Sequence, residues 1–172
     1  MKKLFLLGLA TVLFITCQKR EPQRFFTASS EIDIVKALLT DYHAGDWDAW
    51  AGHYADTAKI YHNTLESATV KETIENLVNI LSNVSTYKFD DGEDDRFYEM
   101  VITDENEKWV YFWGNWRGNL TANNQELIIP VHLALRFADG KIAREFAYYD
   151  ISEFNSALQE IEAAKTAEEE AN

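Results

Sequence analysis

Cysteine, proline and basic residues are all scarce in this 172-residue chain. It has one cysteine, Cys17, and two prolines, and its 16 lysines and arginines face 29 acids, for a formal charge of −13. A single thiol cannot form an intramolecular disulfide, so the fold depends on its core. Nucleic-acid binding relies on basic side chains that neutralise phosphates, so we expect no nucleic-acid partner.

The signatures of several catalytic classes are missing as well. The four histidines, at positions 43, 53, 62 and 132, include no pair spaced four apart and have no cysteine companions. The sequence has no glycine-rich phosphate cradle and no serine in a nucleophile elbow. We therefore expect neither a metal site nor a cofactor.

The apolar run within MKKLFLLGLATVLFIT is shorter than the roughly 20 residues that a membrane span needs. Two lysines precede it and Cys17 follows, which is typical of a secretory signal ending at a lipid-modified cysteine. We expect a signal peptide over residues 1–16 and an exported protein, lipid-anchored through Cys17 to a bacterial membrane on its periplasmic or surface side. Thr16 and Phe14 depart from the usual pattern, and the alternative is a plain signal peptide with a leftover thiol.

Cleavage before Cys17 would remove Lys2, Lys3 and no acid, so the formal charge would fall from −13 to −15. Such a surface repels an anionic bilayer, and membrane attachment would depend on the lipid. We divide the rest of the chain into the anchor cysteine and a tether (17–29), one domain (30–156) and an acidic helical or disordered tail (157–172).

The first half of the domain has helical periodicity. Ser30 is a candidate N-cap, apolar residues follow at helical spacing, and Gly45 ends the first helix. We expect a second, short helix from Asp46 through Tyr54, with Trp47, Trp50 and Tyr54 on its buried face. A short strand over residues 59–62 and a third helix over residues 70–84 follow.

The second half alternates polar and apolar residues. We predict β structure from Tyr87 onward, with long strands near residues 96–103, 108–120, 126–137 and 141–151 joined by short polar turns. Three leading helices and an antiparallel meander predict an α+β fold, in which helices cover one face of a curved sheet and enclose a conical space.

The order of these motifs, with AGDWDAW, YADTAKIYHN and a closing DGKIAREFAYYDISEF, resembles the nuclear transport factor 2-like superfamily over residues 31–155. The resemblance is strongest to its SnoaL-like polyketide-cyclase and ketosteroid-isomerase-like branches. It implies a cone-shaped α+β domain with a deep apolar cavity and frequent dimerisation through the outer face of the sheet. It implies no single reaction, because this fold carries many functions.

The resemblance also implies site residues. His62 falls where the isomerase branch has its proton-abstracting aspartate, while the oxyanion tyrosine falls at Leu38. The isomerase register directs Glu145 and Tyr149 inward, so the candidate catalytic residues are His62, Glu145 and Tyr149. Arg136 and Arg144 would lie outside, which argues against an epoxide-hydrolase-like set. The expected ligand pocket is lined by Tyr42, Trp50, Phe112, Trp116 and Leu133.

Three functions remain open from the sequence. The chain could bind a small hydrophobic molecule in its cone without turnover, transfer protons on such a molecule with His62, or act as an interaction domain with a filled cavity. We also expect a homodimer, because the same register directs Trp109, Tyr111 and Trp113 to the outer face; the alternative cover for that face is a terminal helix. Two ionisable groups converging in one open cavity would favour the enzyme.

Overall fold

The computed structural model describes residues 22–92 and 95–171. Cys17 and the predicted signal peptide lie outside these residues, so lipid attachment stays a prediction. Across the described residues, no helix is both long enough and apolar enough to cross a bilayer.

Seven strands form one sheet in the order β1-β4-β5-β6-β7-β2, and β3 pairs with β5 off this path. β2 runs parallel to β7, and the other pairs are antiparallel. The first half of β5 pairs with β4, and its second half pairs with β3. The strands are β1 (Phe25–Phe26), β2 (Tyr54–His62), β3 (Val84–Phe89), β4 (Arg96–Ile102), β5 (Lys108–Leu120), β6 (Glu126–Ala138) and β7 (Lys141–Tyr149).

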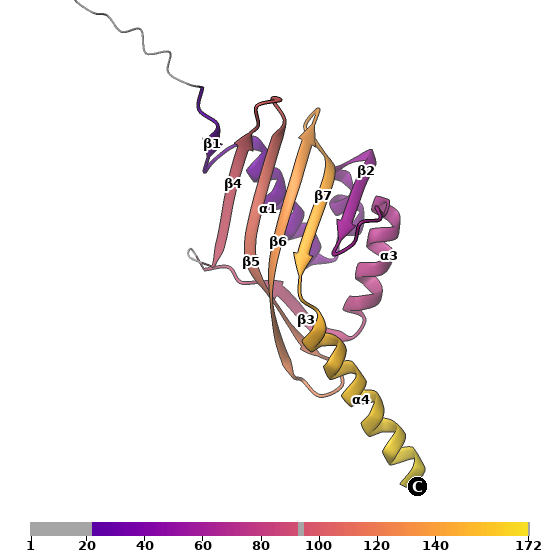
Figure 1. Cartoon of the computed structure of the whole chain (residues 1–172). Helices are drawn as coiled ribbons and strands as arrows, with labels where there is room; N and C mark the ends of the chain where they lie inside the picture. Colours follow the sequence, from indigo (N-terminus) through magenta and orange to yellow (C-terminus); the bar gives the residue numbers. More distant parts are fainter. Residues whose placement is uncertain (1–21, 93–94, 172) are drawn as a thin grey trace, which may run out of the picture.

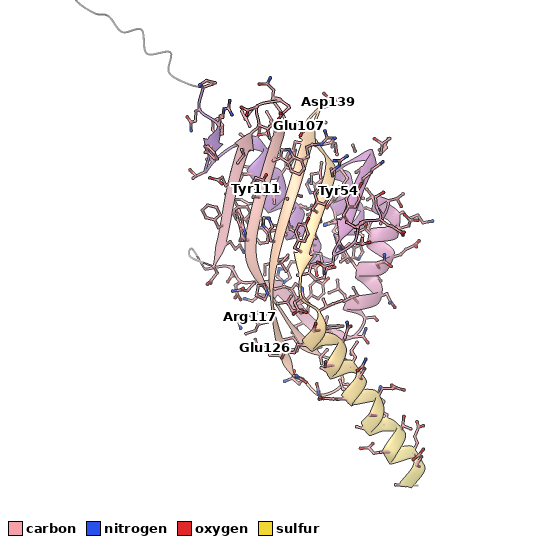
Figure 2. All side chains as sticks on the ribbon, in the orientation of Figure 1. Tyr54, Glu107, Tyr111, Arg117, Glu126 and Asp139 are labelled. Carbon is pink, nitrogen blue, oxygen red and sulfur yellow. The ribbon has the colours of Figure 1, made fainter. Side chains whose placement is uncertain are left out.

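Three helices, α1 (Ser30–Ala44), α2 (Trp47–Gly52) and α3 (Val70–Leu81), cover one face of this curved sheet, and α4 (Ser152–Ala171) projects from the body (Figure 1). The predicted α+β fold is confirmed. Figure 2 shows Arg117 and Glu126 on the lower extension of β5 and β6, where their side chains form an ion pair of 3.7 Å.

Local signals explain most helix ends. Gly45 ends α1 in the left-handed region, with φ +68°, which glycine adopts without steric cost. Thr69 and Glu72 form a reciprocal capping box at the start of α3. The N-cap of α1 is Ser29 rather than the predicted Ser30, because the Ser29 hydroxyl accepts the amide hydrogen of Ile32.

Three predicted elements change where strands pair. Tyr54 begins β2 instead of ending the second helix, because the Ile142 amide of β7 donates to the carbonyl of His53. The region 17–29 was expected to be a tether, but Phe25 and Phe26 pair with β4. Helix α3 also ends at Leu81, three residues earlier than expected, and β3 starts at Val84.

The predicted register of the long strands is confirmed by burial. Val110, Phe112, Leu135 and Glu145 are buried with the helices, and the alternate residues face outward. On that outer face, His132 stacks on Trp113 at 4.5 Å between ring centroids and on Tyr111 at 6.0 Å.

Helix α4 is anchored only near its start. Phe154 and Ala157 are buried against the core, and Leu158 and Ile161 pack partly against it. The remaining residues are exposed, and the helix continues to Ala171, where the sequence predicted a helical or disordered tail.

Candidate functional site

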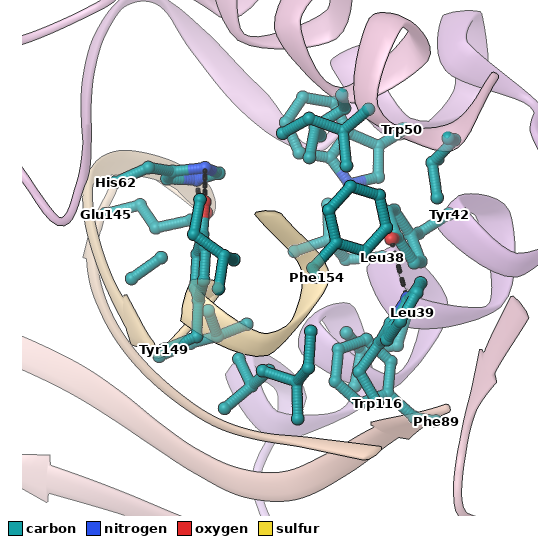
Figure 3. Close-up of a pocket in the computed structure, with 18 of the residues that line it drawn as sticks. Leu38, Leu39, Tyr42, Trp50, His62, Phe89, Trp116, Glu145, Tyr149 and Phe154 are labelled. Atoms are coloured by element: carbon teal, nitrogen blue, oxygen red, sulfur yellow. Dashed lines mark hydrogen bonds and ion pairs between the residues drawn. The ribbon is translucent and has the colours of Figure 1, made fainter. Parts of the chain in front are cut away.

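A cavity of about 110 Å³ lies between the concave face of the sheet and the helices (Figure 3). Aliphatic side chains of α1, α3 and β6 supply much of its wall, including Leu38, Leu77 and Leu133. Its aromatic lining consists of Tyr42, Trp50, Tyr54, Phe89, Trp116, Tyr149 and Phe154.

Four polar side chains form a hydrogen-bonded chain along one wall. The Tyr54 hydroxyl donates to Oε2 of Glu145 at 2.5 Å, and Nε2 of His62 lies 3.1 Å from Oε1 of the same carboxyl group. The Tyr149 hydroxyl lies 3.3 Å from Nδ1 of His62. Figure 3 shows His62, Glu145 and Tyr149 on one side of the cavity, opposite Trp50 and Tyr42.

The parallel pairing of β2 with β7 brings these groups together. Ile60 is registered with Glu145, and His62 with Ala147. Because side chains alternate along a strand, His62 of β2 shares the inner face with Glu145 and Tyr149 of β7. Tyr54 precedes a register shift in β2 and lines the same cavity.

Burial and the charge of Glu145 act together on the two tyrosines. Burial raises the pKa of Tyr54 well above its usual value of 10, and the nearby Glu145 charge raises it further. The pKa of Tyr149 is also raised, first by burial and then by the same charge. Both hydroxyls therefore hold their protons near neutral pH and can donate hydrogen bonds.

These contacts define the tautomer that suits a neutral His62. With its hydrogen on Nε2, the ring donates to Glu145 and leaves Nδ1 free to accept a hydrogen bond from the Tyr149 hydroxyl. When His62 is protonated, Glu145 stabilises the imidazolium, and the Tyr149 hydroxyl is free to donate elsewhere. A buried carboxylate that orients a histidine in this way is a recurring arrangement for proton transfer.

Two hydrogen bonds hold Tyr42 in the opposite wall. The indole Nε1 of Trp116 donates to the Tyr42 hydroxyl at 3.0 Å, and the Tyr87 hydroxyl donates to the Tyr42 carbonyl. Burial raises the pKa of Tyr42, so its hydroxyl stays neutral. The hydrogen bond between Trp116 and Tyr42 satisfies two buried polar groups and fixes the ring positions of this wall.

The structure brings together the three predicted catalytic residues, His62, Glu145 and Tyr149. Of the predicted pocket residues, Tyr42, Trp50, Trp116 and Leu133 line the cavity.

Phe112 does not line it. It is fully buried, but its ring packs against Phe89 and Tyr98, at centroid distances of 5.2 and 5.1 Å. The expected strand face was right, but β3 and β4, which pair with the same edge of β5, supply rings that cover Phe112.

The sequence reasoning missed Tyr54, which it assigned to a helix as a packing residue. Its spacing from Ala58, Ile60 and His62 gave no unbroken period-two signal, because Asp56, at the intervening position, is exposed and the pairing with β7 shifts register between Tyr54 and Lys59. Among the described residues, no three His, Cys, Asp or Glu side chains gather in a way that could hold a metal ion.

Comparisons with known proteins agree with this fold. A nuclear transport factor 2-like protein of unknown function from Burkholderia pseudomallei is 14% identical, with a TM-score of 0.58, over 74% of this chain and 95% of that one. A protein named as a SnoaL-like polyketide cyclase from Shewanella denitrificans is 14% identical, with a TM-score of 0.57, over 77% and 99%.

A third protein, from Catenulispora acidiphila, has a ketosteroid isomerase-like fold and was crystallised with trimethylamine. It is 12% identical, with a TM-score of 0.55, over 70% of this chain and 87% of that one. No curated protein matches the sequence. The model of the SnoaL-like domain matches residues 35–145, and the chain therefore belongs to the SnoaL-like domain family.

Proposed function

We propose that the domain binds a small, largely apolar molecule in its cone and transfers a proton on that molecule through His62 and Tyr149. The observation that carries this proposal is the chain Tyr54–Glu145–His62–Tyr149 at the edge of an otherwise apolar cavity. A carboxyl group is costly to bury without partners. A cavity that only bound apolar molecules would have no need of it.

The residues have distinct roles in this proposal. A proton passes between the ligand and the Tyr149 hydroxyl, and between that hydroxyl and Nδ1 of His62. Glu145 orients the imidazole and stabilises its protonated form, while Tyr54 holds the carboxylate in position. The polyketide cyclase named among the similar structures agrees with proton chemistry at a carbon centre, by analogy of fold alone.

The cavity limits the size of the ligand. At about 110 Å³ it is somewhat smaller than the roughly 150 Å³ cavity known to accept benzene. We therefore expect the buried part of the ligand to be about as large as one six-membered ring.

The test combines binding with proton exchange. We expect cyclohexanone to raise the melting temperature, and the protein to accelerate exchange of its α-hydrogens in deuterated water, followed by NMR. His62→Ala and Tyr149→Phe should slow the exchange by about 10²-fold or more, the usual range for a general acid or base. The exposed His43 supplies the control variant, His43→Ala. If cyclohexanone binds but the exchange rate does not depend on His62, the domain is a binding module and His62 is not catalytic.

We also propose that the outer face of the sheet is a homodimer interface. Phe97, Trp113 and Tyr148 are 51%, 40% and 55% exposed there, beside the stacked rings of Tyr111 and His132. A contiguous aromatic surface of this kind favours burial against a partner. Sedimentation should show a dimer for the wild type and a monomer for Trp113→Ser, with Leu65→Ser, at an exposed site away from this face, unchanged.

For the N-terminus, we propose that the mature chain begins at an acylated Cys17. Mass spectrometry of the membrane fraction should find the acyl mass on that residue. An unmodified chain that starts elsewhere would contradict this proposal.

A further inference from the structure

A second depression, of about 370 Å³, adjoins the cone between α3 and the end of β2. His62 and Tyr149 line both spaces, together with Leu77 and Ile80 of α3. The proposed reacting groups therefore stand at the junction of the two spaces. We call this second space the α3 groove.

The α3 groove differs from the cone in its chemistry. Besides His62 and Tyr149, four neutral polar side chains line it: Thr64, Thr73, Asn76 and Asn79. The Thr73 hydroxyl donates to the carbonyl of Thr69 and can still accept a hydrogen bond, whereas the Thr64 hydroxyl accepts the amide hydrogen of Glu66 and can still donate.

The two asparagines are available to a ligand. Within residues 22–92 and 95–171, the side-chain amides of Asn76 and Asn79 make no hydrogen bond to the protein. Both residues are exposed on α3, and each amide can donate as well as accept.

The charges around the two spaces restrict the ligand further. Among the described residues, no lysine or arginine lines either one, and His62 is the single basic side chain there. With a buried Glu145 and a formal charge of −13, the chain offers little to hold a carboxylate or a phosphate. Neutral amides and hydroxyls suit an uncharged polar group instead.

We propose that the substrate is an amphipathic molecule without formal charge, with a compact apolar end in the cone and a hydroxyl, carbonyl or amide group in the α3 groove. The bond between the two ends would then pass His62 and Tyr149. This inference rests on the proposed function, since it assigns the substrate class of the same site.

Three probes with the same phenyl group test it by calorimetry: ethylbenzene, 3-phenylpropanamide and 3-phenylpropanoate. We expect the amide to bind the wild type about three- to tenfold more tightly than ethylbenzene, the gain typical of one added hydrogen bond. The carboxylate should bind more weakly than the amide. Asn76→Ala should abolish the preference for the amide and leave the affinity for ethylbenzene unchanged.

Asn155→Ala is the matched control, because Asn155 is exposed on α4 and lines neither space. It should keep the preference for the amide. Equal affinities of the wild type for the amide and ethylbenzene, or tightest binding of the carboxylate, would overturn the inference while the cone remained a binding site. If ethylbenzene fails to bind the wild type, the proposed function fails, and the inference fails with it.

Discussion

The side-chain amide of Asn63 forms two hydrogen bonds with the main chain of Tyr149. Its Nδ2 donates to the Tyr149 carbonyl at 2.6 Å, and its Oδ1 accepts the Tyr149 amide hydrogen at 3.1 Å. Asn63 directly follows His62 and has φ +53°, a conformation that asparagine tolerates better than most residues. This pair therefore ties the end of β2 to the end of β7 and sets the spacing of His62 and Tyr149.

Substitutions at Asn63 should separate its backbone role from its side-chain role. Asn63→Gly keeps the left-handed backbone but loses both hydrogen bonds, and we expect the free energy of unfolding to fall by about 1 kcal/mol. Asn63→Ala adds backbone strain and should lose about 1 kcal/mol more. Denaturant titrations measure both values. Equal stability of the wild type and Asn63→Gly would show that the pair contributes nothing.

Tyr54→Phe removes one oxygen atom and should lower the free energy of unfolding by more than the loss of an exposed hydroxyl would. It leaves Oε2 of the buried Glu145 without its donor, and an unsatisfied buried acceptor costs about 1–3 kcal/mol. In a double-mutant cycle with Glu145→Gln, the two changes should be coupled by about 0.5 kcal/mol or more. Additive effects would mean that the short contact carries no energy.

Two glycines of β5 leave room for large rings on the inner face. A Cβ added at Gly114 would lie 2.5 Å from Cζ of Phe112, and one added at Gly118 would collide with the Trp116 indole. Gly114→Ala and Gly118→Ala should each lower the free energy of unfolding by about 1–3 kcal/mol, as overpacking does. Gly52→Ala is the control, because nothing lies within 4 Å of its added Cβ. If Gly114→Ala and Gly118→Ala lose no more stability than Gly52→Ala, the close packing around the two glycines is refuted.

The ion pair of Asp90 with Arg117 predicts a pH dependence. Nε of Arg117 donates to Oδ1 of Asp90 at 2.5 Å, and this hydrogen bond lowers the pKa of Asp90 below its usual 3.8. Because the pKa is lower in the folded state, the stabilisation is complete above the unfolded value and is lost as pH falls below it. The stability difference between the wild type and Asp90→Asn should be constant from about pH 5 to 7 and shrink below about pH 4.

Unfolding curves at several pH values measure this difference, and Asp139→Asn removes the same charge at the exposed turn between β6 and β7 as a control. A difference for Asp90→Asn that grows as the pH falls would contradict the assigned sign.

Removal of Phe154 should enlarge the cavity. This ring lines the cone from α4 and is 4% exposed. Phe154→Ala should lower stability by about 3 kcal/mol and allow naphthalene to bind where the wild type accepts only single rings. Thermal shifts with benzene and naphthalene provide the measurement. Exclusion of naphthalene from the variant would show that α4 does not limit the cavity.

Much of this architecture follows from local patterns. The alternation in residues 108–120 and 126–137 predicts both long strands, and the register of the isomerase branch, which the sequence resembles, implies the inward direction of Trp116 and Leu133. Gly45 marks the end of α1 because glycine takes a left-handed conformation without steric cost. The inward position of Glu145 could be predicted from the sequence once the strand register of the isomerase branch was assumed.

The sequence could not predict the short elements or the contacts between strands. β1 has two residues, too few for any periodicity, and it exists because Phe25 and Phe26 meet the free edge of β4. The displacement of Phe112 from the cavity depends on rings from β3 and β4, which the sequence of β5 does not contain.

The sequence by itself determined the α+β class, the buried faces of the long strands and the candidate trio His62, Glu145 and Tyr149. The class and the alternation along the strands depend on side-chain periodicity, which acts over a few residues, whereas the inward face and the trio follow from the resemblance to the isomerase branch. Only the tertiary structure decided that Tyr54 joins them and that His62 lies between an apolar cone and a polar groove. Both outcomes require the parallel pairing of β2 with β7 and the packing of α3 beside it, and contacts between segments some 85 residues apart leave no local pattern in the chain.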